Sequence, residues 1–176
     1  ELTTAQRKML SHYDNATLYN DSIVAQIVKR FQKEDAVVIY VPDHGEECYE
    51  EDRGFICRNH SANIDWPLAH YEFEIPFWIY CSPKYIRNHR DIYRQIRKAK
   101  DKRFMTDALP HLLLYLAGIE TPTYKEEYNI LSPKYNEIRP RILKNSADYD
   151  QLRDEHLEKV EKEKSKKEKS KKGDKK

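Results

Sequence analysis

Two short apolar runs in the sequence indicate β-strands. Residues 36–41 and 75–81 are each rich in β-branched and aromatic side chains, and a proline follows each run within two residues. Short length, β-branched composition and an immediate stop are typical of a buried strand rather than a helix. A helix from Asp14 or Asn15 to about Gln32 is predicted before the first run. Its apolar face would consist of Leu18, Ile23, Val24, Ile27, Val28 and Phe31.

The pattern after the second run predicts more helices and one long connection. Residues 86–102 form an amphipathic, strongly basic segment, and a leucine stripe at 106–117 is followed by Gly118 as a stop. Three prolines within 119–143 indicate an ordered crossing loop. A last helix is expected from Ser146, and the polar, Lys-rich sequence beyond Lys162 predicts disorder.

Charge is unevenly distributed along the 176 residues. The net charge is +2, but residues from Gln151 onward hold 11 Lys/Arg and 7 Asp/Glu, which leaves the preceding body at −2. A slightly acidic body argues against a nucleic-acid-binding core. No apolar run approaches the roughly 18 residues of a membrane-spanning helix. Because the chain begins with Glu1 and shows no signal-peptide pattern, we interpret it as a fragment or processed piece.

The first apolar run ends abruptly in Pro42, Asp43, His44 and Gly45. Open α/β sheets place their chemistry just beyond the carboxyl ends of strands, and Asp and His are ligands that a zinc-like ion accepts. Asp43 and His44 are therefore candidate metal ligands. The alternative is a turn in which Asp43 caps the next element and His44 is merely exposed.

Two ligands are too few for zinc, which takes four protein ligands, or three and a water. The nearby candidates to complete or extend the site are His60 and His70, followed by Glu46 and Glu47. The chain contains no GxSxG, P-loop or GxGxxG pattern that would identify a nucleophile or a phosphate cradle. The residues alone therefore predict part of a metal site in an α/β domain.

Several short motifs occur together in one order along the chain. They are Tyr13-Asp14-Asn15, Tyr19 with Asp21, Asp43-His44-Gly45-Glu46, a His-bearing loop, Ile75-Pro76, Leu116-Ala117-Gly118-Ile119 and Leu131-Ser132. In these motifs the chain resembles the carboxyl-terminal part of a phosphoethanolamine transferase. Such enzymes form part of the sulfatase-like branch of the alkaline phosphatase superfamily. The resemblance covers roughly residues 13–132.

The resemblance implies an inner-membrane enzyme whose catalytic domain faces the periplasm. Such enzymes move phosphoethanolamine from a phospholipid to a lipid A, core sugar or glycan acceptor, and a threonine is phosphorylated in between. By position, Asp43 and His44 would bind the catalytic zinc, whose acidic and threonine ligands would lie before Glu1. His60 matches a histidine that contacts the transferred phosphate or a second metal. The nucleophile is thus expected upstream, and this chain alone is expected to be inactive.

The fold implied is α/β, part of an alkaline-phosphatase-like sandwich with a mixed or mostly parallel sheet flanked by helices. Residues 1–145 would be the carboxyl-terminal portion of the catalytic domain, without its amino-terminal half and membrane anchor. Residues 146–176 would be a charged helix and a disordered tail. The implied partners are the phospholipid donor, the acceptor, and the membrane through an upstream anchor, with no nucleic acid. The oligomeric state is left open.

The chain departs from the family pattern in the loop that carries His60. This loop is longer than usual, and Cys48 and Cys57 flank the extra residues. The two thiols would pair in an oxidising periplasm or stay free and buried. Glu74 stands where the family often has a histidine before the second strand, so His70 replaces that contact in space or the contact is absent.

Two rival functions follow from the same residues. A sulfatase or phosphodiesterase of the same superfamily would share the fold and the Asp-His pair but use another nucleophile. A non-catalytic module would instead use the basic residues at 87–102 and the Lys-rich tail on anionic lipid or nucleic acid.

Overall fold

The computed structural model describes residues 1–50, 53–57 and 63–173, with side chains at all of these positions except 55–57 and 167–173. The chain divides into two compact units. One unit comprises Glu1–Pro42 and Pro76–Arg139, and the other comprises Asp43–Ile75 and Pro140–Lys176. The candidate ligands Asp43 and His44 lie at the start of the second unit.

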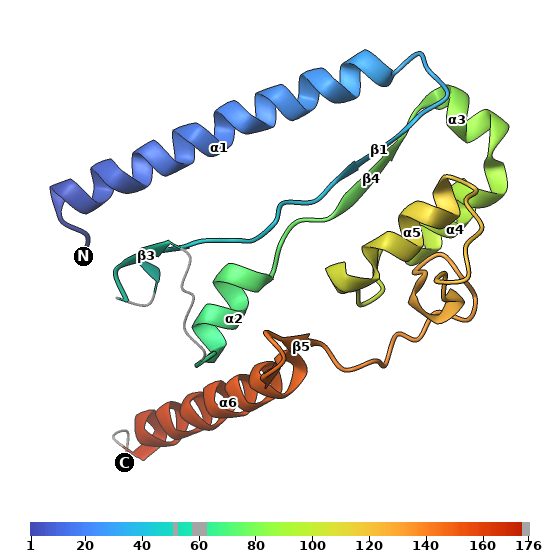
Figure 1. The fold of residues 1–176 in the computed structure, drawn as a ribbon. Helices are drawn as coiled ribbons and strands as arrows, with labels where there is room; N and C mark the ends of the chain where they lie inside the picture. Colours follow the sequence, from blue (N-terminus) through green and yellow to red (C-terminus); the bar gives the residue numbers. More distant parts are fainter. Residues whose placement is uncertain (51–52, 58–62, 174–176) are drawn as a thin grey trace. The chain divides into compact units, whose positions relative to one another are not determined.

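The first unit opens with the long helix α1 (Thr4–Phe31) (Figure 1). The predicted start at Asp14 or Asn15 is wrong, because a capping box lies earlier. The Thr3 hydroxyl accepts a hydrogen bond from the Gln6 amide at 3.3 Å, and the Gln6 side chain accepts one from the Thr3 amide at 2.8 Å. Among the described residues, none of α1 is buried.

Strand β1 (Val37–Tyr40) pairs with β4 (Trp78–Cys81) in an antiparallel ladder (Figure 1). The register places Val37 opposite Cys81 and Tyr40 opposite Trp78. Both predicted strands are confirmed, and Pro76 precedes β4 as expected for a strand entry. Tyr40 and Trp78 stack across the ladder with ring centroids 5.2 Å apart, as expected of a favourable cross-strand aromatic pair.

The buried Ser82 joins the end of this ladder to the next helix. Its hydroxyl donates to the Glu34 carbonyl at 2.6 Å and accepts from the amide of Tyr85 at 3.0 Å. That second bond caps α3 (Pro83–Asn88), and the non-helical His89 separates α3 from α4 (Arg90–Ala99). The single helix predicted at 86–102 is therefore two helices.

The core of the first unit lies between α4 and the segments that follow it. The short helix η2 (Thr106–Ala108) leads into α5 (Leu109–Leu116), and η3 (Glu126–Tyr128) interrupts the long loop. Gly118 has φ +65°, which confirms the predicted helix stop. The buried members of this core are Ala99, Leu112, Ile130 and Leu131.

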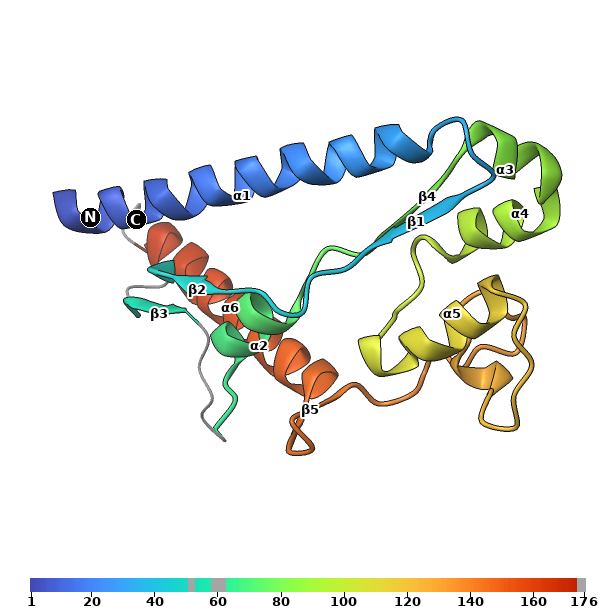
Figure 2. The ribbon, with the colours of Figure 1, turned by 45° about the horizontal axis from the view of Figure 1, so that its top comes forward.

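Among its described residues, the second unit has two short hairpins, each followed by a helix (Figure 2). Strands β2 (Glu47–Cys48) and β3 (Phe55–Cys57) pair antiparallel, and α2 (Trp66–Phe73) follows. The sequence of residues 46–70 shows no clear periodicity, so these elements were not predicted. The missed start of α2 is Asp65, whose carboxylate accepts from the Leu68 amide at 3.1 Å, with Pro67 in the first turn.

The last hairpin, β5 (Ile142–Leu143) with β6 (Ala147–Asp148), leads into α6 (Tyr149–Gly173). Helix α6 contacts α2 through the Trp66 ring, which stacks on His156 at 5.2 Å. The helix continues through the Lys/Glu-rich sequence for which disorder was predicted. Pairs one turn apart, such as Lys162 with Glu158 at 3.1 Å, favour this helix.

All three sheets among the described residues are two-stranded and antiparallel. The expected α/β class is confirmed, but the described residues contain no pair of parallel strands. Each partner strand returns in the opposite direction, and in β2–β3 and β5–β6 the connection is too short for the crossover that a parallel pair requires.

Candidate metal centre

The turn that carries Asp43 and His44 is fixed by its neighbour, Gly45. The Gly45 amide donates to the Glu72 carbonyl at 2.8 Å, near the end of α2. A Cβ atom at this position would lie 2.1 Å from the Tyr71 carbonyl oxygen. Only glycine allows the backbone to approach α2 this closely. Local packing therefore holds the turn in place against a helix of the same unit.

Asp43 and His44 present two potential ligand atoms side by side. The Asp43 side chain is 85% exposed and the His44 ring 26%, and Asp43 Oδ2 lies 3.5 Å from His44 Nε2. His44 Nδ1 lies 2.7 Å from the Gly45 carbonyl oxygen. Because a carbonyl can only accept, Nδ1 carries the proton when this bond forms, and Nε2 keeps its lone pair in the neutral ring.

This geometry fits a tetrahedral zinc ion. Zinc–nitrogen and zinc–oxygen bonds near 2 Å place two ligand atoms about 3.3 Å apart at tetrahedral corners. The 3.5 Å between Asp43 Oδ2 and His44 Nε2 is close to that separation. A backbone carbonyl that fixes the imidazole tautomer is also the usual outer contact of a histidine ligand. The capping alternative is not seen, since the chain continues from Asp43 towards β2 and no helix begins there.

The described residues do not complete the coordination sphere. No group of three or more His, Cys, Asp or Glu side chains in the described ranges is arranged to hold a metal ion. His60 lies outside the described residues. His70 lies on α2, stacked on Trp66 at 5.4 Å, with Nδ1 2.9 Å from Glu74 Oε1. Its part in the site stays a prediction.

Glu74 links α2 to α6. Its carboxylate accepts a hydrogen bond from the Tyr149 hydroxyl, and Oε1 lies within ion-pair distance of His70 Nδ1, at 2.9 Å. Burial opposes ionisation of Glu74, but the contacts with Tyr149 and His70, together with the charge of Arg141, outweigh it and hold the pKa of Glu74 below its usual value. Glu74 thus places a negative charge beside His70 Nδ1.

A chain of ion pairs that begins at a buried carboxylate holds the hairpin that follows the turn. Glu47, which is fully buried, contacts Arg53, and Arg53 Nη1 lies 2.5 Å from Asp65 Oδ2 at the cap of α2. Burial raises the pKa of Glu47, and the nearby charge of Arg53 only partly offsets this. Sequence reasoning named Glu47 as a ligand candidate but missed both partners, since nothing in the spacing links Arg53 to a residue on either side.

The cysteine prediction falls partly outside the described side chains. The β2–β3 register places Cys57 opposite Glu47, the neighbour of Cys48. Cys48 is buried, and the Cys57 side chain is not among those described. Pairing of the two thiols therefore stays a prediction.

Comparison with known proteins identifies the family. The sulfatase family model matches residues 1–119. The chain belongs to the sulfatase family. The predicted resemblance to phosphoethanolamine transferases is confirmed as well. Phosphoethanolamine transferase EptC of Escherichia coli O18:K1:H7 is 31% identical to this sulfatase-family chain over 159 residues, covering 86% of the chain and 26% of EptC.

Two further relatives agree with this placement. Kdo(2)-lipid A phosphoethanolamine 7''-transferase of Escherichia coli K12 is 28% identical over 99 residues, 54% of this sulfatase-family chain and 16% of the enzyme. The crystal structure of the C-terminal periplasmic domain of Escherichia coli EptC in complex with zinc matches with a TM-score of 0.69 at 28% identity. That match covers 86% of this chain and 43% of the solved one.

The sulfatase-family chain spans about a quarter of the length of EptC. No helix in the described ranges is both long and apolar enough to cross a membrane.

Proposed function

We propose that the chain contributes Asp43 and His44 to the catalytic zinc site of a phosphoethanolamine transferase. The reaction would move phosphoethanolamine from a phospholipid to a lipid A, core sugar or glycan acceptor. The observation that carries the proposal is the 3.5 Å between Asp43 Oδ2 and His44 Nε2, in a turn where His44 Nδ1 is held by the Gly45 carbonyl. The zinc-bound structure of the EptC domain supports the choice of metal.

Zinc bound here would lower the pKa of a coordinated hydroxyl and neutralise charge on phosphoryl oxygens. The residues of this chain would hold and orient the reacting groups. Asp43 would supply an anionic oxygen, and His44 would supply Nε2 in a ring whose tautomer and orientation the Gly45 carbonyl sets. His60 and His70 are proposed to contact the transferred phosphate, with His70 held by Glu74 and by stacking on Trp66.

The nucleophile and the remaining zinc ligands are proposed to come from outside these 176 residues. The described residues bring no third ligand to Asp43 and His44. We therefore expect the 176-residue chain by itself to show no transferase turnover. Turnover by the purified chain would contradict the proposed division of the site.

We further propose that the chain forms part of a larger sandwich fold. Residues 1–145 would form part of a sandwich in which further strands extend the β1–β4 ladder into a mixed sheet, and residues 146–176 would be an appended charged segment. The ladder supports this, since a pair of strands is marginally stable by itself. The related EptC domain is periplasmic, which favours a periplasmic domain of an inner-membrane enzyme.

Zinc content tests the metal site directly. In equilibrium dialysis against zinc we expect the purified chain to retain zinc above the level of the buffer, but only weakly, because it supplies two of the ligands. Asp43→Ala and His44→Ala should each lose most of it, because each removes one coordinating atom. Metal is measured by mass spectrometry of the protein fraction.

Two matched variants control for loss of an arbitrary carboxylate or imidazole. His12 and Asp14 are exposed on α1, so His12→Ala and Asp14→Ala remove the same groups away from the turn. Both should retain zinc as the unmodified chain does. Equal zinc content in all five proteins would refute the site and favour a non-catalytic binding module.

A further inference from the structure

The outer side of α4 carries a dense positive charge. Residues 84–103 contain nine Lys/Arg and two Asp/Glu, a net charge of +7, whereas the rest of residues 1–150 has a net charge of −9. Within this segment five basic residues share one side of α4 and its helical C-cap residue, which we call the basic face. They are Arg90, Arg94, Arg97, Lys98 and Lys100.

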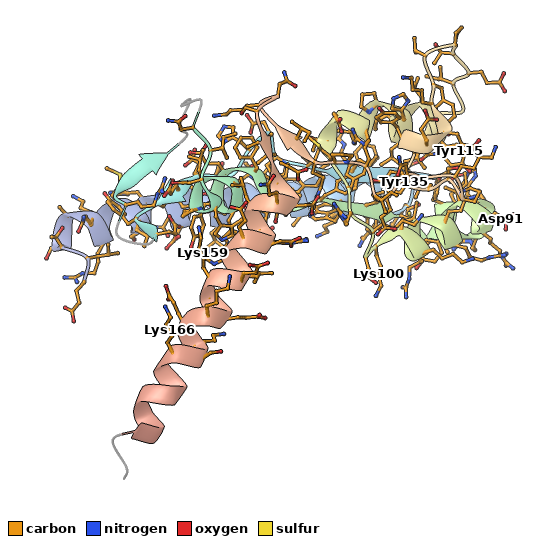
Figure 3. All side chains as sticks on the ribbon, turned by 90° about the horizontal axis from the view of Figure 1, so that it is seen from below. Asp91, Lys100, Tyr115, Tyr135, Lys159 and Lys166 are labelled. Carbon is orange, nitrogen blue, oxygen red and sulfur yellow. The ribbon has the colours of Figure 1, made fainter. Side chains whose placement is uncertain are left out.

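The fold turns the basic face outward. At 100° per residue its five side chains span about 160° of the helix circumference. The opposite side, with Ile92, Ile96 and the buried Ala99, packs on the core of the first unit. All five basic side chains are exposed, and the labelled Asp91 and Lys100 mark the surface of α4 in Figure 3.

Little of this charge is neutralised within the chain. Arg94 pairs with Asp91 at 3.2 Å and Lys100 with Asp101 at 3.6 Å, both exposed contacts. Within the described ranges, no carboxylate lies in ion-pair range of Arg90, Arg97 or Lys98. The face therefore has a strong uncompensated field, as expected of a surface that meets an anionic partner.

The Lys-rich helix α6 differs in this respect. Residues 149–166 hold five Lys/Arg and six Asp/Glu, so their charges cancel. Lys162 pairs with Glu158 at 3.1 Å, and Arg153 pairs with Asp154 at 2.8 Å. Figure 3 shows Lys159 and Lys166 on this helix. Residues 149–166 of α6 thus form a solvated helical segment whose charges nearly balance.

We propose that the basic face of α4 docks the protein on the anionic surface of a phospholipid bilayer. This inference rests on the proposed function, in which the donor and the acceptor lie in a membrane. A planar bilayer would contact only one side of the protein, so a single positive face is enough for docking. A nucleic acid that extended beyond α4 would meet a body with strong net negative charge. Docking through arginine and lysine would hold the domain near its lipid substrates and would weaken as salt screens the charges.

Vesicle co-sedimentation tests the proposal. The purified chain is mixed with vesicles of equal parts phosphatidylglycerol and phosphatidylcholine, or of phosphatidylcholine alone, at low and at high salt. Each basic residue near an anionic surface raises partitioning roughly fivefold. The triple variant Arg90→Glu, Arg94→Glu, Arg97→Glu should therefore bind anionic vesicles at least about 100-fold more weakly.

The control makes the same charge change on α6, with Lys159→Glu, Lys162→Glu and Lys166→Glu. It should bind anionic vesicles nearly as the unmodified chain does. Circular dichroism should show both triple variants folded, since all six residues are exposed. An equal loss of binding in the two triple variants would overturn the proposal, and so would equal binding to phosphatidylcholine alone or no vesicle binding at all.

Two further samples separate this inference from its alternatives. A short DNA duplex competing as strongly as anionic vesicles would assign the basic face to nucleic acid instead. Asp43→Ala should bind vesicles as the unmodified chain does. Vesicle binding in a chain that retains no zinc would therefore overturn the proposed function alone, and zinc retention without vesicle binding would overturn only the docking proposal.

Discussion

Replacing Gly45 with alanine tests most directly whether the close contact with α2 shapes the turn that carries Asp43 and His44. The new methyl group would lie 2.1 Å from the Tyr71 carbonyl oxygen, about 1 Å inside van der Waals contact. The turn must then move away from α2, which weakens the 2.8 Å hydrogen bond from Gly45 to Glu72. That bond contributes about 1 kcal/mol, and the forced backbone shift costs about 1–3 kcal/mol.

One effect acts in the other direction. Alanine restricts the unfolded chain and so stabilises by about 0.4–1 kcal/mol. The net expectation for Gly45→Ala is a loss of about 2 kcal/mol in the free energy of unfolding of the second unit. Because Asp43 and His44 move with Gly45, zinc retention should fall in parallel.

Urea denaturation followed by circular dichroism, with metal analysis of the same samples, measures both effects. Gly118→Ala is the matched control, since Gly118 has φ +65° and open space around its Cβ position. It should cost about 1 kcal/mol through backbone strain alone and leave zinc retention unchanged. If Gly45→Ala stays within about 0.5 kcal/mol of the unmodified chain and keeps its zinc, the close contact with α2 does not shape the turn.

Two other contacts give further expectations. Arg53→Ala should cost about 3 kcal/mol in urea denaturation, because it leaves the Glu47 carboxylate buried without its cation. The same change in a Glu47→Gln background should cost much less, and equal costs would contradict the ion pair. Tyr149→Phe should lower stability by about 1 kcal/mol at neutral pH by removing the bond to Glu74. Because folding lowers the pKa of Glu74, its contribution is present above pH 4.5 and is lost as pH falls through the lowered value. Stability measured from about pH 6 to about pH 3 should therefore fall less steeply in Tyr149→Phe, and parallel curves would count against this link.

Elements with strong local patterns could be predicted from the sequence. The runs at 36–41 and 75–81 became β1 and β4, and the leucine stripe before Gly118 became α5. Errors arose where a short polar signal decides the boundary. Thr3 with Gln6 begins α1 far upstream of Asp14, and Ser82 starts a separate helix before α4. The exposed apolar side of α1 shows that periodicity predicts a helix face but does not say what covers it.

In the candidate site, too, some contacts could be predicted from the sequence and others depend on the fold. The closeness of Asp43 and His44 follows from adjacency, so sequence could predict that pair. The requirement for glycine at position 45 depends on α2, whose backbone arrives from later in the chain. The contacts of Arg53 with Glu47 and Asp65 depend equally on the fold, because side chains six and twelve residues apart meet only once the hairpin and α2 have formed.

Ser82 couples the opening of the β1–β4 ladder to the fraying of α3. One hydroxyl accepts hydrogen bonds from the amides of Ala36 and Tyr85 and donates to the Glu34 carbonyl. Opening of the β1–β4 ladder at this end therefore removes the cap of α3, and fraying of α3 loosens the ladder. The strand end and the first turn of the helix should behave as one cooperative folding unit. The basic face of α4, which follows directly, is thereby held by a unit that opens as a whole and not residue by residue.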